Sequence, residues 1–300
     1  MSINRLVLTG SLLALLSAVA YATNTPFSTW VFDGGGSPLM VVLGRSLGAC
    51  VLSAVYCRVT GVPLFQTALM PVTSLLGFFL FAQGAFYIGS VNFIPVSLAA
   101  LVFFTWPVLV GMVSLRSAPV ASRLWQALAF GLAFGGLALA LQADLSGLDP
   151  TGVVLAISGS VCMASYMLLA GRKFPRQIHP VLTNLRINFV IVLFTLAVAL
   201  FLGVDLVTGA LDTWKPLLAI TVFYSIATLT QLLAVKRAGA RLPSLIYNLE
   251  PVISILLAAA FLGERLLGQQ LLGAGMVLLA LLLFALASVR GREELENKAA

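Results

Sequence analysis

Apolar stretches of roughly bilayer length follow one another along the whole chain. The hydrocarbon core of a membrane is about 30 Å thick, and an α-helix needs roughly 20 apolar residues to cross it. Such stretches recur ten times, and short loops marked by Gly, Pro or charge separate most of them. The pattern predicts ten membrane-spanning helices at residues 6–22, 39–57, 71–88, 95–115, 122–142, 151–170, 181–203, 215–235, 243–262 and 269–289.

The composition supports an all-α integral membrane protein. Hydrophobic residues make up 60% of the 300 residues, and charged residues only 9%. A soluble globular protein carries about 25% charged residues, so this chain has too few charges to cover a surface that faces water. The three cysteines lie inside apolar stretches, where a free Cys behaves as a small hydrophobic residue. They indicate neither a disulfide framework nor a metal site.

The first apolar stretch has a second interpretation. Arg5, the apolar run after it and the small residues Ala18-Val19-Ala20 are also typical of a secretory signal peptide. However, this stretch resembles the sixth one at an offset of 145 residues. Such similarity is not expected of a leader that is removed, so we interpret the stretch as the first span.

The distribution of charge predicts the orientation. In a ten-span arrangement, 13 of the 17 Lys and Arg residues fall on the side of the N-terminus, and only Lys215 and Arg265 fall opposite. All Asp residues lie on that opposite side. Because cytoplasmic loops carry the excess of Lys and Arg, we expect both termini in the cytoplasm. No basic run exceeds two residues, which argues against nucleic acid as a partner.

The two halves of the sequence resemble each other. Pro107 and Pro251 lie 144 residues apart, each inside an apolar stretch, and Ala20-Tyr21 precedes Ser165-Tyr166 by 145 residues. Spans 1–5 would thus form a first repeat and spans 6–10 a second one. Because five is an odd number, the second repeat must insert in the opposite direction.

An inverted repeat of this kind favours a secondary transporter. Many such carriers place their substrate site near mid-membrane, where the two repeats meet. We therefore expect two inverted five-helix repeats around a central cavity, with residues 1–145 as the first repeat, 146–290 as the second and 291–300 as a cytoplasmic tail. The alternative is a gene duplication that was retained for packing alone.

Pro107 and Pro251 are candidates for hinges. Proline removes a backbone donor and disrupts the hydrogen-bond ladder of a helix. Irregular backbone at membrane depth must be buried in protein or line a wet cavity. We predict that both prolines bend their spans and shape the cavity, although bends that serve packing alone are the alternative.

Aromatic and polar residues inside the spans are candidates for substrate contacts. Phe103 and Trp106 share one helix face and could stack on an apolar substrate group, unless they face lipid. Polar residues within spans usually face the bundle interior. They could bind the amino and carboxylate groups of a substrate, or form interhelical hydrogen bonds worth about 1–2 kcal/mol. The predicted substrate-binding residues are Gln83, Tyr87, Phe103, Trp106, Tyr166, Tyr224, Asn248 and Glu250.

Three charged residues lie well inside the spans. Glu250 could titrate during transport, pair with an arginine, accept a hydrogen bond from an ammonium group, or act as a structural carboxyl group. Arg45 and Arg186 each lie about six residues into a span, where they could bind the substrate or extend to the headgroup layer.

The ninth and tenth stretches resemble a known family. They read Asn248-Leu249-Glu250-Pro251-Val252, then Phe261-Leu262-Gly263-Glu264, then Gly273. This resembles the signature of the EamA-type half of the drug/metabolite transporter superfamily. The first half departs from the pattern, because Trp106 stands where Glu250 does and no acidic residue matches Glu264. Within the superfamily, Trp106-Pro107 and residues 160–166 resemble bacterial aromatic amino-acid exporters of the YddG kind.

The resemblance implies a multi-pass carrier of a bacterial-type inner membrane that exports small metabolites. We expect export of aromatic or other hydrophobic amino acids by alternating access. The alternatives are an EamA-type exporter of other small drugs or sugar-like metabolites, and a channel-like facilitator. The expected partners are a small-molecule substrate and the lipid bilayer, and the sequence is compatible with a monomer or a homodimer.

An intramembrane enzyme is the rival class. Glu250 is the one carboxylate that lies inside a span away from a loop, and the sole histidine, His179, lies in a loop. Motifs for a metal or for ATP are absent from the sequence. We therefore expect no enzymatic activity, no metal and no cofactor.

Overall fold

The computed structural model describes residues 3–63, 70–115, 120–141, 149–173, 179–206, 212–262 and 267–299. All regular structure in these ranges is helical. The helices are α1 (Ile3–Ala22), α2 (Asn24–Asp33), α3 (Pro38–Val59), α4 (Met70–Ser90), α5 (Val96–Phe103), α6 (Trp106–Leu115), α7 (Val120–Leu141), α8 (Pro150–Lys173), α9 (Pro180–Leu202), α10 (Trp214–Ala238), α11 (Arg241–Ile246), α12 (Leu249–Leu262) and α13 (Gly268–Ala299).

The helices lie at the positions that the hydropathy pattern predicts. Among the described residues, eight helical stretches are long and apolar enough to cross a membrane, and Leu98–Val113 and Gly268–Phe284 are shorter apolar helices. The prediction of an all-helical membrane protein is thus confirmed, with eight to ten apolar helices. Two of the predicted spans consist of two helices each: α5 with α6, and α11 with α12. A helix that the pattern did not predict, α2, follows the first predicted span, where a loop was expected.

The predicted bends at the two prolines take the form of helix breaks. Phe104 and Thr105 separate α5 from α6, and Tyr247 and Asn248 separate α11 from α12. Pro107 and Pro251 therefore lie in the first turn of α6 and α12, where no intrahelical partner is needed for a backbone N–H. A proline at such a position begins a helix instead of distorting one.

Side chains complete the end of each preceding half-helix in the same way. The Thr105 hydroxyl donates a hydrogen bond to the Val102 carbonyl at 2.7 Å. The Asn248 amide donates to the Leu245 carbonyl at 3.0 Å. Each bond satisfies a carbonyl three residues earlier that the broken helix leaves without its usual partner. The two breaks are therefore built from equivalent local contacts.

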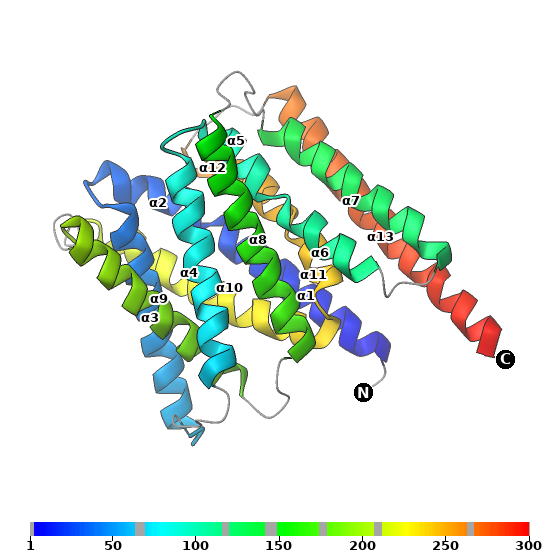
Figure 1. The fold of residues 1–300 in the computed structure, drawn as a ribbon, viewed down its shortest axis with the longest axis horizontal. Helices are drawn as coiled ribbons and strands as arrows, with labels where there is room; N and C mark the ends of the chain where they lie inside the picture. The colour runs from blue at the N-terminus through cyan, green and yellow to red at the C-terminus, as the bar shows by residue number, and fades with distance from the viewer. Residues whose placement is uncertain are drawn as a thin grey trace.

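The helices form a bundle with two tightly packed pairs at opposite edges. α7 and α13 run side by side along one edge, and α3 packs against α9 at the other (Figure 1). Between them α1 packs chiefly on α10, and α4 packs chiefly on α8. This arrangement places α1, α6, α8, α10 and the α11–α12 break around the centre of the molecule.

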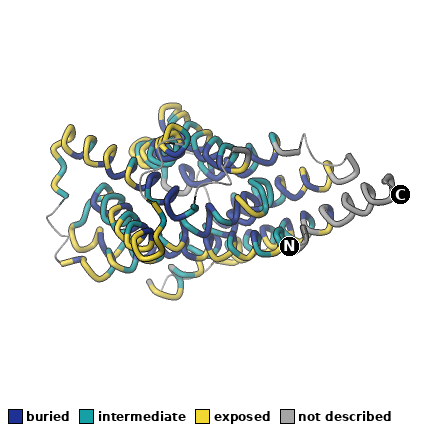
Figure 2. The backbone as a smooth tube through the Cα atoms, turned by 90° about the horizontal axis from the view of Figure 1, so that it is seen from below, coloured by how far each residue is buried: buried dark blue, intermediate teal, exposed yellow. Residues whose placement is uncertain are grey.

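Burial in this bundle follows the pattern of a protein in lipid. Leu200 and Phe201 of α9 are 82% and 89% exposed, and apolar side chains on the outer faces of many other helices are exposed as well. Figure 2 shows buried residues along the inner side of the helices and exposed ones outside. The main cluster of buried apolar residues includes Trp106, Tyr166 and Tyr247. The core of the protein is therefore rich in aromatic side chains.

Candidate functional site

Five aromatic side chains meet at the centre of the bundle, and we call them the central aromatic cluster: Tyr21, Trp106, Tyr166, Tyr224 and Tyr247. The ring of Tyr21 lies 6.1 Å from that of Tyr224 and 6.4 Å from that of Tyr247. The rings of Tyr247 and Trp106 are 5.9 Å apart. Tyr166 belongs to the same buried cluster as Trp106 and Tyr247. The first span, the sixth, the eighth and both broken spans thus contribute to one site.

The helix breaks position two members of the central aromatic cluster. Trp106 is the first residue of α6, and Tyr247 lies in the break before α12. Both are almost completely buried, as is Tyr166 on α8. Both large side chains thus come from the few residues at which a helix ends and the next one begins. The breaks therefore determine which aromatic side chains lie in the site.

Buried polar groups gather around the central aromatic cluster. The Tyr21 hydroxyl donates a hydrogen bond to Oε1 of Gln231 at 3.1 Å. The hydroxyl of Tyr247 interacts with the side chains of Ser17 and Gln231. In the described part of the chain, Nε of Arg45 is buried and makes no hydrogen bond. Polar groups beside aromatic rings form a surface suited to an amphipathic ligand.

Two opposite charges face this region from different halves of the chain. The Arg45 guanidinium lies over the ring of Tyr224, with its central carbon 4.5 Å from the ring centre. Such cation–π contacts hold a cation over an aromatic face. Arg45 also attracts the carboxylate of Glu250, which is half-buried on α12. Glu250 further acts electrostatically on Tyr21 and Tyr247, so it lies close to the central aromatic cluster.

The other predicted site residues lie beside this cluster. The rings of Tyr87 and Phe103 are 5.1 Å apart, and Phe103 packs against the buried cluster that contains Trp106. Gln83 lies one turn before Tyr87 on α4. The backbone of α8 comes close to it at Gly159, where an added Cβ would be 3.2 Å from the carbonyl oxygen of Gln83. Glu250 acts electrostatically on Tyr87 as well. Phe103 and Glu250 therefore connect the predicted pair on α4 to the centre.

Asn248 has a structural contact of its own. Its side chain is buried, and its amide nitrogen donates a hydrogen bond to the Leu245 carbonyl at the end of α11. A contact between Asn248 and a substrate stays a prediction.

Three residues at this site, Tyr21, Gln231 and Tyr247, are not among the substrate-binding residues that the sequence predicts. For Tyr21 a signal was present, because the repeat aligns Ala20-Tyr21 with Ser165-Tyr166 and thus with the predicted Tyr166. Tyr247 gave no such signal. It enters the site because the helix is interrupted there, and the helical spacing used to define polar faces does not extend across a break.

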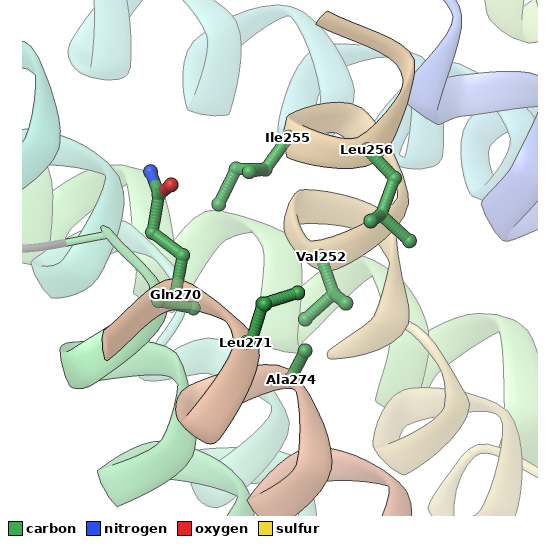
Figure 3. A pocket seen from close by; sticks show the side chains of 7 residues that line it. Val252, Ile255, Leu256, Gln270, Leu271 and Ala274 are labelled. Atoms are coloured by element: carbon green, nitrogen blue, oxygen red, sulfur yellow. The ribbon is translucent and has the colours of Figure 1, made fainter. Parts of the chain in front are cut away.

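A separate crevice lies between α12 and α13. Figure 3 shows its lining, which is almost entirely apolar and includes Gln270 as the exception. Leu256 and Leu271 line it and are exposed on the outer surface of the bundle. The crevice therefore belongs to the apolar exterior and is distinct from the central aromatic cluster.

Comparison with known proteins shows a family resemblance in the second half of the chain. Residues 150–286 match the EamA-like transporter family. This part of the chain is therefore EamA-like. The matched range covers α8 to α13 up to residue 286, and it includes the second helix break with Glu250 and Pro251. The resemblance noted from the sequence is thereby confirmed for this part of the chain.

Curated relatives and a solved structure extend the likeness to most of the chain. The threonine/homoserine exporter RhtA of Salmonella typhimurium is 25% identical over 260 residues, which are 85% of this chain and 84% of that protein. An uncharacterized transporter, sll1319, of Synechocystis is 26% identical over 200 residues, or 63% of this chain and 59% of its own length. A crystal structure with 19% identity has the same fold, with a TM-score of 0.80 over 93% of this chain and 98% of that one. The family match and the exporter from Salmonella support a small-molecule exporter.

Proposed function

We propose that this chain exports small amphipathic metabolites, above all aromatic and other hydrophobic amino acids, by alternating access. The observation that carries the proposal is the central aromatic cluster, with the buried polar groups that lie among its rings. Aromatic rings suit an apolar side chain, and the polar atoms suit an amino or carboxylate group. The exporter from Salmonella, which is named for threonine and homoserine, supports an amino-acid cargo.

We propose further that the chain consists of two inverted repeats, residues 1–145 and 146–290, followed by the tail 291–300. The pairing of helices supports this. In the proposed repeats, α8 is the counterpart of α1, and α4 is the counterpart of α10. α1 packs chiefly on α10, and α8 packs chiefly on α4. The two helix breaks with equivalent side-chain contacts support it as well. Two halves related in this way can exchange conformations, so that the site opens to either side of the membrane in turn.

The residues of the site take distinct roles in this proposal. Phe103 and Trp106 contact the apolar part of the substrate. The polar end is bound by Gln83, Tyr87, Tyr166, Tyr224, Asn248 and Glu250. Pro107 and Pro251 begin the half-helices α6 and α12, whose movement about the breaks opens and closes the site. The excess of basic residues on the side of the termini supports a bacterial-type inner membrane location with both termini in the cytoplasm.

A transport panel tests the proposal. Protein reconstituted into liposomes would be assayed for uptake of labelled phenylalanine, with and without an imposed pH gradient, against tryptophan, leucine, threonine, a sugar and a cationic dye as competitors. We expect the aromatic and hydrophobic amino acids to compete best, and preloaded unlabelled substrate to accelerate uptake, as a carrier requires. Competition by threonine alone would contradict the aromatic preference. Competition by the sugar or the dye alone would favour the alternative cargo, and uptake without acceleration would favour a channel.

A further inference from the structure

We propose that the site binds its cargo as a zwitterion, with the carboxylate held by Arg45 together with Gln231 and Tyr247, and the ammonium group held by Glu250. This inference rests on the proposed amino-acid export and adds how the two charged ends are recognised. It also gives a substrate-binding role to Arg45, Gln231 and Tyr247, which were not among the predicted site residues.

The first argument is the balance of charge. Arg45 on α3 and Glu250 on α12 are ionisable groups of opposite sign inside the bundle, and Arg45 favours the charged form of the Glu250 carboxyl group. Charges at membrane depth are costly unless they are paired. A zwitterion adds one charge of each sign, so each of its ends can meet an opposite charge and the site keeps the same net charge. A purely cationic or anionic cargo would leave one of the two protein charges facing a like charge.

The second argument is the chemistry of the buried donors. Nε of Arg45 is buried without a hydrogen bond in the described part of the chain. Nε2 of Gln231 and the hydroxyl of Tyr247 are further donors, and these two side chains interact with each other. A carboxylate is the group that accepts several such bonds at once, and bonds to charged groups are the stronger ones. These donors, together with a guanidinium, therefore point to the carboxylate end of the cargo.

The third argument is that neighbouring tyrosines hold these donors in place. The hydroxyl of Tyr21 occupies Oε1 of Gln231, so Nε2 is the end of that amide that can donate to a ligand. The ring of Tyr224 lies under the Arg45 guanidinium, and the ring of Tyr21 lies 6.1 Å from that of Tyr224. Tyr21 and Tyr224 thus connect the two donors through direct contacts. The apolar part of an aromatic amino acid would extend from there toward Tyr247 and Trp106, whose rings are in contact.

Capped analogues test this inference. In reconstituted liposomes, phenylalanine, its methyl ester and N-acetylphenylalanine would each compete with labelled phenylalanine. The ester lacks the carboxylate and the acetylated form lacks the ammonium group. We expect both to compete at least about tenfold more weakly than phenylalanine, since one charge–charge contact is lost in each case. If both capped forms compete as well as phenylalanine, the zwitterion inference is overturned while amino-acid export stands. If phenylalanine itself is neither transported nor a competitor, both proposals fall.

Charge-neutral variants assign the two ends. Arg45→Gln should lose its discrimination against the ester but still reject N-acetylphenylalanine, and Glu250→Gln should show the opposite pattern. Arg58→Gln is the control, because Arg58 lies on the same helix as Arg45 but is exposed near its end, and it should behave as the unmodified protein. Elution on size exclusion would verify folding, and Arg45→Lys keeps the charge if Arg45→Gln does not fold. The same pattern of discrimination in both neutral variants would overturn the assignment.

Discussion

Replacing Gly273 by leucine is expected to leave little folded protein after extraction from the membrane. A Cβ at this position would contact the carbonyl oxygen of Gly136, and it would lie 2.5 Å from the backbone nitrogen of Ala140. Both atoms are backbone atoms of α7, so they can yield only if α7 and α13 separate. Close packing through small residues is a main source of helix association in membranes. Overpacking costs about 1–3 kcal/mol where side chains can adjust, and here they cannot.

Gly275→Leu is the matched control for this change. Gly275 lies two residues further along α13, and a Cβ there would meet no atom within 4 Å. We expect Gly275→Leu to elute as a single peak on fluorescence-detected size exclusion and to melt near the temperature of the unmodified protein. Gly273→Leu should give a broad or void-volume peak, or a melting temperature lower by many degrees. Equal elution and melting of the two variants would contradict the tight contact between α7 and α13.

The spans were predictable from the sequence because the membrane imposes a local rule. Each helix must satisfy its own backbone hydrogen bonds and present about 20 apolar residues, so length and hydropathy suffice to locate it. The prolines also located the interruptions to within a few residues. Their form was not predictable from Pro107 and Pro251 alone. Whether a span bends or breaks depends on side chains such as Thr105 and Asn248, which take up the carbonyl groups at the end of the preceding half-helix.

The site was predictable only in part. Trp106, Tyr166 and Tyr224 lie in the central aromatic cluster, because an aromatic or polar residue in mid-span favours the interior. The pair on α4, Gln83 and Tyr87, lies beside it. Spacing along one helix shows that two residues share a face but does not show which helix that face meets. The hydrogen bond between Tyr21 and Gln231 joins residues 210 positions apart, and no local pattern encodes such a contact.

Replacing Trp106 by alanine is expected to reduce transport of aromatic amino acids strongly. The side chain is buried in the central aromatic cluster and contacts the ring of Tyr247. Its removal takes away the largest apolar surface of the proposed site together with an aromatic contact worth about 0.5–1.5 kcal/mol beyond its buried area. We expect the uptake rate of phenylalanine per folded protein to fall by about tenfold or more, since about 1.4 kcal/mol corresponds to a factor of ten. Trp106→Phe keeps an aromatic ring and should retain a larger share of the rate.

Trp125→Ala separates this effect from the general loss of a large side chain. Trp125 is 44% exposed on α7, away from the central aromatic cluster, and its replacement should leave phenylalanine uptake unchanged. Removing a buried tryptophan costs about 3–5 kcal/mol of stability, so Trp106→Ala will melt at a lower temperature whatever its role in transport. Uptake is therefore normalised to the folded fraction, and the concentration dependence is measured for both variants. If Trp106→Ala melts lower but transports at the normal rate per folded molecule, Trp106 stabilises the bundle without contacting the substrate, because the two effects have separate physical causes.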